Sequence, residues 1–144
     1  MRVTAADQKR YPRFAAYVRV DMKNAAAVPA IARAMNRIAH LDQARLTTAL
    51  SWGTAPTIRI TPLVAAYGYF TPGVHSNEIW IDAKTVQAFE AGRGRRAVRA
   101  GRVYLVGVTL LHELVHWGDD QDGVDRPGEE GEELERLLYG RVVF

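Results

Sequence analysis

The spacing of apolar positions along the chain first indicates helices. Pro29 suits the first turn of a helix that extends to about Leu41. Within this stretch apolar side chains recur every three or four residues, at Ile31, Met35, Ile38 and Leu41. Leu46 and Leu50 repeat the spacing over a shorter segment. The first part of the chain is therefore predicted to be largely helical.

The pattern then changes to the alternation that is typical of strands. Thr57–Thr61 alternates polar and apolar residues, which indicates a half-buried strand. Val64–Phe70 is rich in β-branched and aromatic residues and contains Gly68, so we expect a strand with a bend or bulge. Glu78–Asp82 alternates again, and its last residue can cap a following helix. The middle of the chain is predicted to form the sheet.

Helical patterns return in the last third of the chain. Ala91–Arg96 is predicted to be a flexible basic connection, followed by a helix that begins within Ala97–Arg102 and continues to Trp117. This helix is apolar nearly all round, which is typical of a central, buried helix. Gly118 is expected to end it, and a last helix is expected over Glu129–Tyr139.

The order helical, strand-rich, helical predicts an α+β fold. We expect a compact domain over residues 1–144, with a small mixed sheet, an exposed edge strand, a central helix and a C-terminal helix rich in glutamate. Its 48% apolar and 24% charged residues are typical of a globular protein. No apolar run approaches the roughly 18 residues of a membrane span. The first 13 residues lack the apolar core of a secretory signal.

The predicted central helix carries the sequence His112-Glu113-Leu114-Val115-His116. Two histidines four residues apart on a helix project from the same face, and neutral imidazole is a natural zinc ligand. Glu113 can reach a water beside the metal and take its proton during attack on a carbonyl. The motif therefore predicts a zinc-dependent hydrolase, with His112 and His116 as metal ligands and Glu113 as catalytic base.

The third metal ligand is narrowed by exclusion. The chain contains no cysteine, and none of its four histidines follows His116. Because a catalytic zinc ion normally has three protein ligands, the third is expected to be a carboxylate. The obvious source is residues 129–135, which include five glutamates.

Helical phase suggests which of these glutamates faces the metal. If Leu134, Leu137 and Leu138 face the interior, Glu130 and Glu133 lie beside them. We predict Glu130 as the third ligand and Glu133 as its competitor for the same position, with the other one able to orient a ligand histidine. The remaining three are expected on the flank or the outside: Glu129, Glu132 and Glu135.

Charge is distributed unevenly and leaves an alternative open. Residues 119–135 hold nine acids and one base, a net charge of −8, so the rest of the chain carries +11. Five arginines precede the motif: Arg93, Arg95, Arg96, Arg99 and Arg102. The alternative is a non-enzymatic, metal-containing module that contacts nucleic acid or a protein through this basic face. Few aromatic residues accompany the arginines, which disfavours nucleic acid.

The acidic segment also approaches a calcium-binding pattern. Residues 118–129 nearly match an EF-hand loop, but Gly118 stands where the first aspartate ligand is required. We therefore interpret the segment as a solvated acidic loop.

Taken together, the C-terminal features resemble a known family. His112–Gly118, a short acidic loop, Glu129-Glu130-Gly131, Leu134-Glu135 and Tyr139-Gly140 resemble the metallopeptidase toxin domains of bacterial polymorphic toxins. Those domains are compact zincins, carried by secreted effectors that include type VI secretion cargo. The resemblance spans about Leu110 to Gly140 and suggests a gluzincin-like zinc peptidase.

The resemblance also implies partners and a place of action. It implies a protein or peptide substrate, an immunity protein, and delivery as cargo or fusion of a secretion apparatus. Such delivery would carry the chain out of a bacterial cell without a signal peptide and into a target cell; otherwise a cytoplasmic location is expected. In zincins the substrate lies antiparallel to an exposed edge strand, which we expect within Ala66–Trp80.

Overall fold

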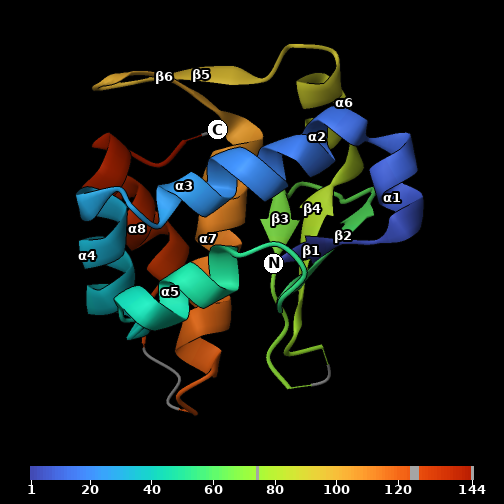
Figure 1. Ribbon diagram of the computed structural model, residues 1–144. Coiled ribbons are helices and arrows are strands. Elements are labelled where there is room, and N and C mark those ends of the chain that lie inside the picture. Colours follow the sequence, from blue (N-terminus) through green and yellow to red (C-terminus); the bar gives the residue numbers. More distant parts are fainter. Residues whose placement is uncertain (74, 124–126, 144) are drawn as a thin grey trace.

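The central sheet has four strands in the order β1-β2-β4-β3 (Figure 1). The computed structural model describes residues 1–73, 75–123 and 127–143. The strands are β1 (Arg2–Val3), β2 (Thr57–Thr61), β3 (Gly68–Tyr69) and β4 (Glu78–Asp82). β1, β2 and β4 are parallel, and β3 pairs antiparallel with β4 at one edge. The sheet is therefore mixed, as predicted, and its short antiparallel strand is an edge strand.

Helices pack beside the sheet and make the fold α+β (Figure 1). They are α1 (Ala5–Arg10), α2 (Pro12–Tyr17), a π-helical turn η1 (Val18–Met22), α3 (Lys23–Ala25), α4 (Pro29–Ala39), α5 (Gln43–Leu50), α6 (Ala83–Glu90), α7 (Leu105–Asp120) and α8 (Glu130–Tyr139). α7 contacts β4 and β3 of the sheet, and it also contacts α4, α6 and α8. None of the helices in the described ranges is long and apolar enough to cross a membrane.

The burial of α7 follows from its apolar sequence. Leu110 and Leu114 are fully buried and belong to the same core cluster as Ile81 of β4, Met35 of α4 and Leu134 of α8. A helix held on nearly every side by apolar contacts is a rigid base for polar groups that emerge from it. The prediction of a central, buried helix is confirmed.

The two predicted strands with clear alternation have the predicted bounds, but the segment between them differs. Asp82 caps α6, and its Oδ2 accepts a hydrogen bond from the backbone N of Thr85 at 3.2 Å. Of the strand expected over Val64–Phe70, only Gly68–Tyr69 is extended in the sheet. Ala65 has a positive φ of 57°, which interrupts the extended backbone, and Val64 is 95% exposed.

A second hairpin replaces the expected start of the central helix. Residues 95–104 form two antiparallel strands, β5 (Arg95–Val98) and β6 (Gly101–Tyr104), and α7 begins only at Leu105. Gly101 has a φ of 133°, which permits the tight turn. Val98 and Val103 pack against the small apolar cluster of Leu105, Val108 and Val143. The expected start of the central helix, within residues 97–102, is therefore wrong.

Gly118 does not end α7, which continues to Asp120. Instead, Leu41 packs against this glycine: a Cβ atom at position 118 would lie 2.6 Å from Leu41 Cδ1 and 3.0 Å from Ala39 Cβ. Gly118 is thus a packing glycine inside the helix. The last helix agrees with the prediction, since α8 ends at Tyr139 and Gly140 adopts the left-handed conformation that closes it.

Gly107 offers a test of how tightly α7 is packed. An alanine inside a helix is normally favoured over glycine by about 1 kcal/mol. A Cβ atom at Gly107, however, would overlap the hydroxyl of Tyr17 and lie 3.2 Å from its Cζ, while the Tyr17 ring lies against Phe89 and Tyr104. Gly107→Ala should therefore lower the free energy of unfolding by about 1–3 kcal/mol in urea titrations. The same change in a Tyr17→Phe background should cost clearly less; an equal cost in both would contradict this account.

Candidate active site

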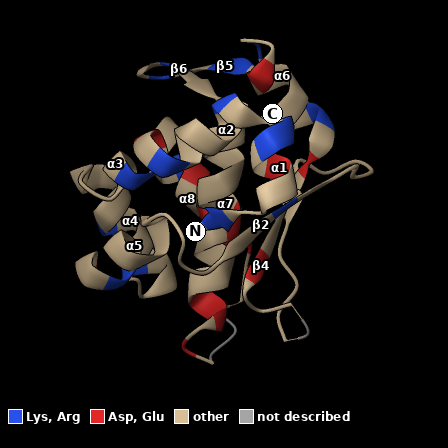
Figure 2. Cartoon of the chain, turned by 45° about the vertical axis from the view of Figure 1, so that its right-hand side comes forward, with Lys and Arg blue, Asp and Glu red and all other residues tan. Residues whose placement is uncertain are grey.

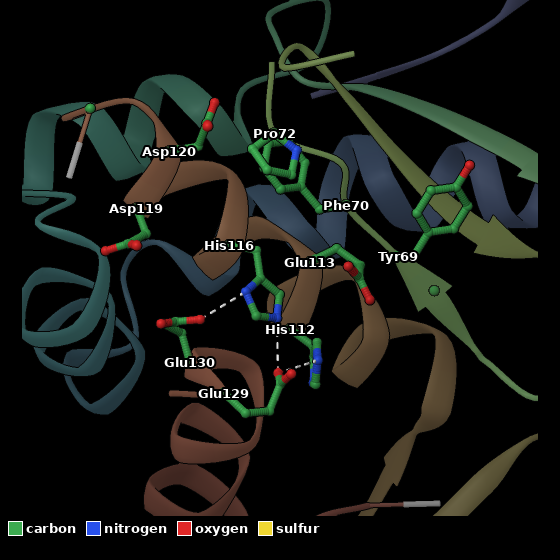
Figure 3. A pocket seen from close by; sticks show the side chains of 12 residues that line it. Tyr69, Phe70, Pro72, His112, Glu113, His116, Asp119, Asp120, Glu129 and Glu130 are labelled. Carbon is green, nitrogen blue, oxygen red and sulfur yellow. Dashed lines mark hydrogen bonds and ion pairs between the residues drawn. The ribbon is translucent and has the colours of Figure 1, made fainter. Parts of the chain in front are cut away.

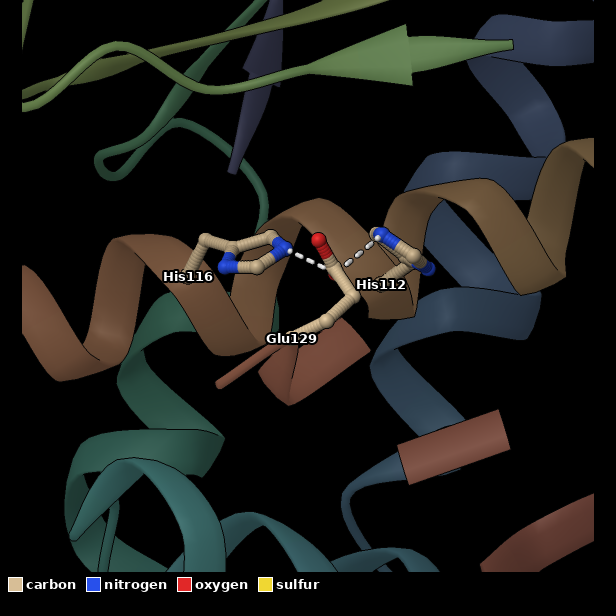
Figure 4. A group of neighbouring side chains, drawn as sticks. All are labelled: His112, His116 and Glu129. Carbon is tan, nitrogen blue, oxygen red and sulfur yellow. Dashed lines mark hydrogen bonds and ion pairs between the residues drawn. The ribbon is translucent and has the colours of Figure 1, made fainter. Parts of the chain in front are cut away.

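His112 and His116 lie one turn apart on the same face of α7. Their ring centroids are 5.2 Å apart, and each side chain is 21% exposed. The i, i+4 spacing on a helix dictates this arrangement. Both Nε2 atoms face the first residues of α8, as Figure 4 shows.

A carboxylate oxygen of Glu129 lies between the two Nε2 atoms. Its Oε1 is 2.9 Å from Nε2 of His116 and 3.2 Å from Nε2 of His112 (Figure 4). Glu129 is the residue that immediately precedes α8, where the backbone has not yet become helical (φ −111°, ψ 89°). These three side chains form a group whose ligand atoms are close enough together to hold a metal ion.

The other nitrogen of each histidine contacts a buried carboxylate. Nδ1 of His112 is hydrogen-bonded to Glu135 Oε1 at 2.7 Å, and Nδ1 of His116 lies 3.0 Å from Glu130 Oε2. Glu135 and Glu130 are only 4% and 6% exposed. Glu135 in turn accepts a hydrogen bond from the backbone N of Val143 at 2.5 Å. Carboxylates in these positions fix the ring orientations and the tautomers.

This hydrogen-bonding pattern fits a bound cation. In a protonated imidazole, Nε2 can donate to the Glu129 oxygen, with which Nε2 of His116 is at hydrogen-bond distance. In neutral imidazoles with the proton on Nδ1, the two Nε2 lone pairs and the Glu129 oxygen converge instead, and two imidazoles with one carboxylate match the ligands of a catalytic zinc site. Burial, the largest influence, lowers the pKa of His112, but the hydrogen bond to Glu135 and the nearby carboxylates outweigh it and raise the pKa overall.

The structure moves our expectation for the third ligand from Glu130 or Glu133 to Glu129. Glu130 faces the site but occupies the Nδ1 side of His116, and Glu133 is not part of the metal-capable group found in the described residues. Glu129 was expected on the flank because it was treated as helical. Its non-helical backbone turns the side chain toward the histidines, so helical phase does not apply to it.

Glu135 was also expected outside, and it is buried. The expectation assumed that Leu134, Leu137 and Leu138 all face the interior. Leu137 is instead 49% exposed, whereas Glu130, Gly131, Leu134 and Glu135 are the buried residues of α8. The buried face is therefore rotated toward positions 131 and 135, and Glu133 is only half-buried.

Gly131 makes the close approach of α8 possible. A Cβ atom at this position would overlap the ring of His112. A glycine in the first turn of a helix disfavours that helix, so its presence indicates a packing requirement. Gly131 thus marks the place where α8 meets the helix that carries the two histidines.

Glu113, the expected catalytic base, lies on α7 and is 4% exposed. Burial, as the main cause, raises its pKa to about 8; His112 acts in the opposite direction, and Glu129 and Glu135 reinforce the rise. A cation between the histidines would lower this value, because positive charge favours the carboxylate. Gly68 of the edge strand packs on Glu113: a Cβ atom there would lie 2.7 Å from Oε1.

A cavity of about 480 Å³ is lined by the motif residues His112, Glu113 and His116 together with Glu129 and Glu130 (Figure 3). Its wall opposite α7 comes from Gly68, Tyr69, Phe70 and Pro72, and its end near the C-terminus of α7 from Asp119 and Asp120. A smaller cavity of about 170 Å³ shares His112 and Glu113 with it and is otherwise lined by Tyr67, Glu132 and Val143, among others. A site with a carboxylate, two histidines and an open groove can accommodate an extended ligand.

Other residues considered from the sequence lie outside this site. His75 is 51% exposed and contacts Glu78 and Trp80, not the cavity. The arginines of the β5–β6 hairpin do not line either cavity. The helical backbone through Asp120 is incompatible with an EF-hand loop that begins at Gly118; residues 124–126 of the acidic segment lie outside the described ranges.

Comparison with known proteins agrees with this geometry. No curated protein and no solved structure matches the chain. The sequence profile of a family described as metallopeptidase toxin 3 matches residues 7–140, a span that includes both histidines and all the carboxylates around them. The resemblance to metallopeptidase toxin domains is thereby confirmed, and a metallopeptidase requires a metal. The chain belongs to the metallopeptidase toxin 3 family.

Proposed function

We propose that this chain is a zinc-dependent endopeptidase of the gluzincin type, with His112, His116 and Glu129 as metal ligands and Glu113 as catalytic base. The observation that carries the proposal is the convergence of the two histidine Nε2 atoms and one oxygen of Glu129, beside the buried carboxylate of Glu113. Membership of a metallopeptidase toxin family supports the same chemistry. Zinc rather than another metal is favoured by two imidazole ligands and one carboxylate.

The residues around the metal divide the catalytic work. Bound zinc would polarise the scissile carbonyl and lower the pKa of water. Glu113 accepts a proton from the attacking water and later delivers it to the leaving amine. Its buried setting raises its pKa, whereas bound zinc would lower it, so the two effects oppose each other at this carboxylate. Glu130 and Glu135 hold the two imidazoles with Nε2 directed at the metal.

The edge strand β3 is a candidate binding surface for the substrate. Gly68 and Tyr69 line the cavity next to Glu113, and within the described part of the chain β3 pairs with β4 alone. An extended peptide can pair with the free side of such a strand through its backbone. We propose that the substrate is a protein segment bound in this way, with its scissile carbonyl next to Glu113.

The biological setting is proposed from the family. A toxin acts on a cell other than its producer, so we propose that the domain is delivered by a secretion apparatus, such as type VI secretion, and cleaves a protein of the target cell. A producer of such a toxin needs protection, which an immunity protein would provide.

The β5–β6 hairpin favours a second candidate function. Its exposed arginines, Arg95 and Arg102 among them, could bind nucleic acid or an acidic protein. If the domain only binds a partner, neutralising Arg95 and Arg102 should remove a salt-sensitive interaction with that partner. Glu113→Gln should then have no effect on the interaction.

Glu113→Gln tests the catalytic assignment. The amide keeps the shape of the side chain but cannot accept the proton, so the rate of peptide cleavage should fall by at least about 10²- to 10⁴-fold. Toxicity on expression in a sensitive cell should disappear. Zinc content, measured by mass spectrometry of the metal, should stay at the wild-type level as the control. Metal-dependent cleavage that survives the change would overturn the mechanism.

Three glutamine variants separate the ligand from the orienting carboxylates. Glu129→Gln should weaken zinc binding, measured in competition with a chromophoric chelator, by more than about 100-fold. Glu130→Gln should weaken it by roughly 10- to 100-fold, the range for a carboxylate that orients a ligand. Glu133→Gln should bind like the wild type. If Glu130→Gln had the largest effect and Glu129→Gln little, Glu130 would be the ligand.

Gly68→Ala tests the contact between the edge strand and the catalytic base. The added Cβ would lie 2.7 Å from Glu113 Oε1 and from Thr109 Cγ2, so the carboxylate must move. A displacement of this size is expected to lower kcat by about 10- to 100-fold. Zinc affinity should be unchanged, since Gly68 does not contact the metal-ligating group. Unchanged kcat would show that the contact does not position Glu113.

A further inference from the structure

The larger cavity beside the metal-ligating residues has two unlike sides. Phe70 and Pro72, from the segment after β3, form an apolar wall, and Asp119 and Asp120 close the end near the last turn of α7 (Figure 3). Its volume of about 480 Å³ leaves room for a side chain together with the backbone that carries it. An apolar wall that leads to carboxylates suits a long side chain with a charged end.

The charged residues that line this cavity are acidic. No lysine or arginine is among the described residues of the lining. Apart from the HExxH residues, the charged ones are Asp119, Asp120, Glu129 and Glu130. The segment 119–135 keeps a net charge of −8 with Arg126 included. A divalent cation between the histidines would offset part of this charge. The end of the cavity near the last turn of α7 would stay negative. The carbonyl end of a helix adds to the same negative potential.

A buried oxygen of Glu130 has no donor among the residues that the structure describes. Glu130 contacts His116 through Oε2, but its Oε1 makes no hydrogen bond within the described ranges, and the residue is only 6% exposed. A buried acceptor without a donor is costly. A cationic group held by Asp120, which is half-buried at the same cavity, would offset the charge of the Glu130 carboxylate behind it. Lysine and arginine carry only donors.

Two carboxylates in the lining of the smaller cavity already have partners within the protein. Glu132, which lines it, is paired with Arg136 at 2.5 Å. Glu135, also in its lining, is engaged by His112 and Val143 through both oxygens. Glu132 and Glu135 are therefore engaged within the protein, which leaves the end near Asp120 as the side suited to discriminate between substrates by charge.

We propose that the larger cavity is a specificity pocket for a lysine or arginine side chain of the substrate, recognised chiefly by Asp120 with Asp119 and Glu130 behind it. This inference rests on the proposed function, because it assigns a substrate class to the same site. The aliphatic stem packs on Phe70 and Pro72, and the cationic end lies among the carboxylates. Acidic side chains are repelled from the pocket.

The test uses the full chain loaded with zinc and a peptide library whose cleavage sites are identified by mass spectrometry. Lysine and arginine should be enriched at one position near the cleaved bond. Asp120→Asn should lower kcat/KM for the basic peptides by about tenfold, and Asp120→Lys should shift the preference toward acidic residues. Glu132→Gln, a matched change in the smaller cavity, should leave the preference unaltered.

A binding measurement keeps this inference separate from catalysis. On the Glu113→Gln variant, a peptide with lysine at the selected position should bind about tenfold more tightly than the same peptide with glutamate, and Asp120→Asn should remove the difference. If basic peptides bind with this preference but Glu113 is irrelevant to cleavage, the proposed function fails and the pocket stands. If cleavage depends on Glu113 but neither Asp120 variant changes the preference, the specificity pocket is wrong.

Discussion

The contact on which the site depends is the one between the histidine face of α7 and the first turns of α8. Three carboxylates of residues 129–135 converge on two imidazoles: Glu129 on both Nε2 atoms, Glu130 and Glu135 on one Nδ1 atom each. Burying two of these carboxylates would be costly without partners, and the imidazole N–H groups provide them. The same contacts that satisfy the buried charges also orient the lone pairs that a metal requires.

The rest of the fold can be understood as support for this contact. Gly131 lets α8 approach the His112 ring, and Leu134 anchors that helix in the core. On the opposite side of the motif, Gly68 lets the sheet edge approach Glu113. Two glycines without side chains thus set the spacing on either side of α7, while its apolar residues hold it in place.

Much of this could be predicted from the sequence, because the patterns involved are local. The alternation of Thr57–Thr61 and Glu78–Asp82, the capping by Asp82 and the HExxH spacing each depend on a few neighbouring residues. The hairpin at 95–104 was missed because valine and arginine suit both helix and strand, and the turn at Gly101 decides between them. Glu129 was expected on the flank because helical phase was applied to a residue that lies just outside the helix.

The two halves of the site differ in how far apart along the chain their partners lie. His116 and Glu129 are 13 residues apart, and His112 and Glu135 are 23 apart. The half of the site that α7 and α8 form therefore closes over a short loop. Gly68 and Glu113 come from distant parts of the sequence, and their contact requires the sheet. Short loops close early and at low entropic cost, whereas distant contacts form with the complete fold. On the proposed assignment, the metal ligands would therefore need only the pairing of α7 with α8, whereas hydrolysis of a peptide would need the complete fold.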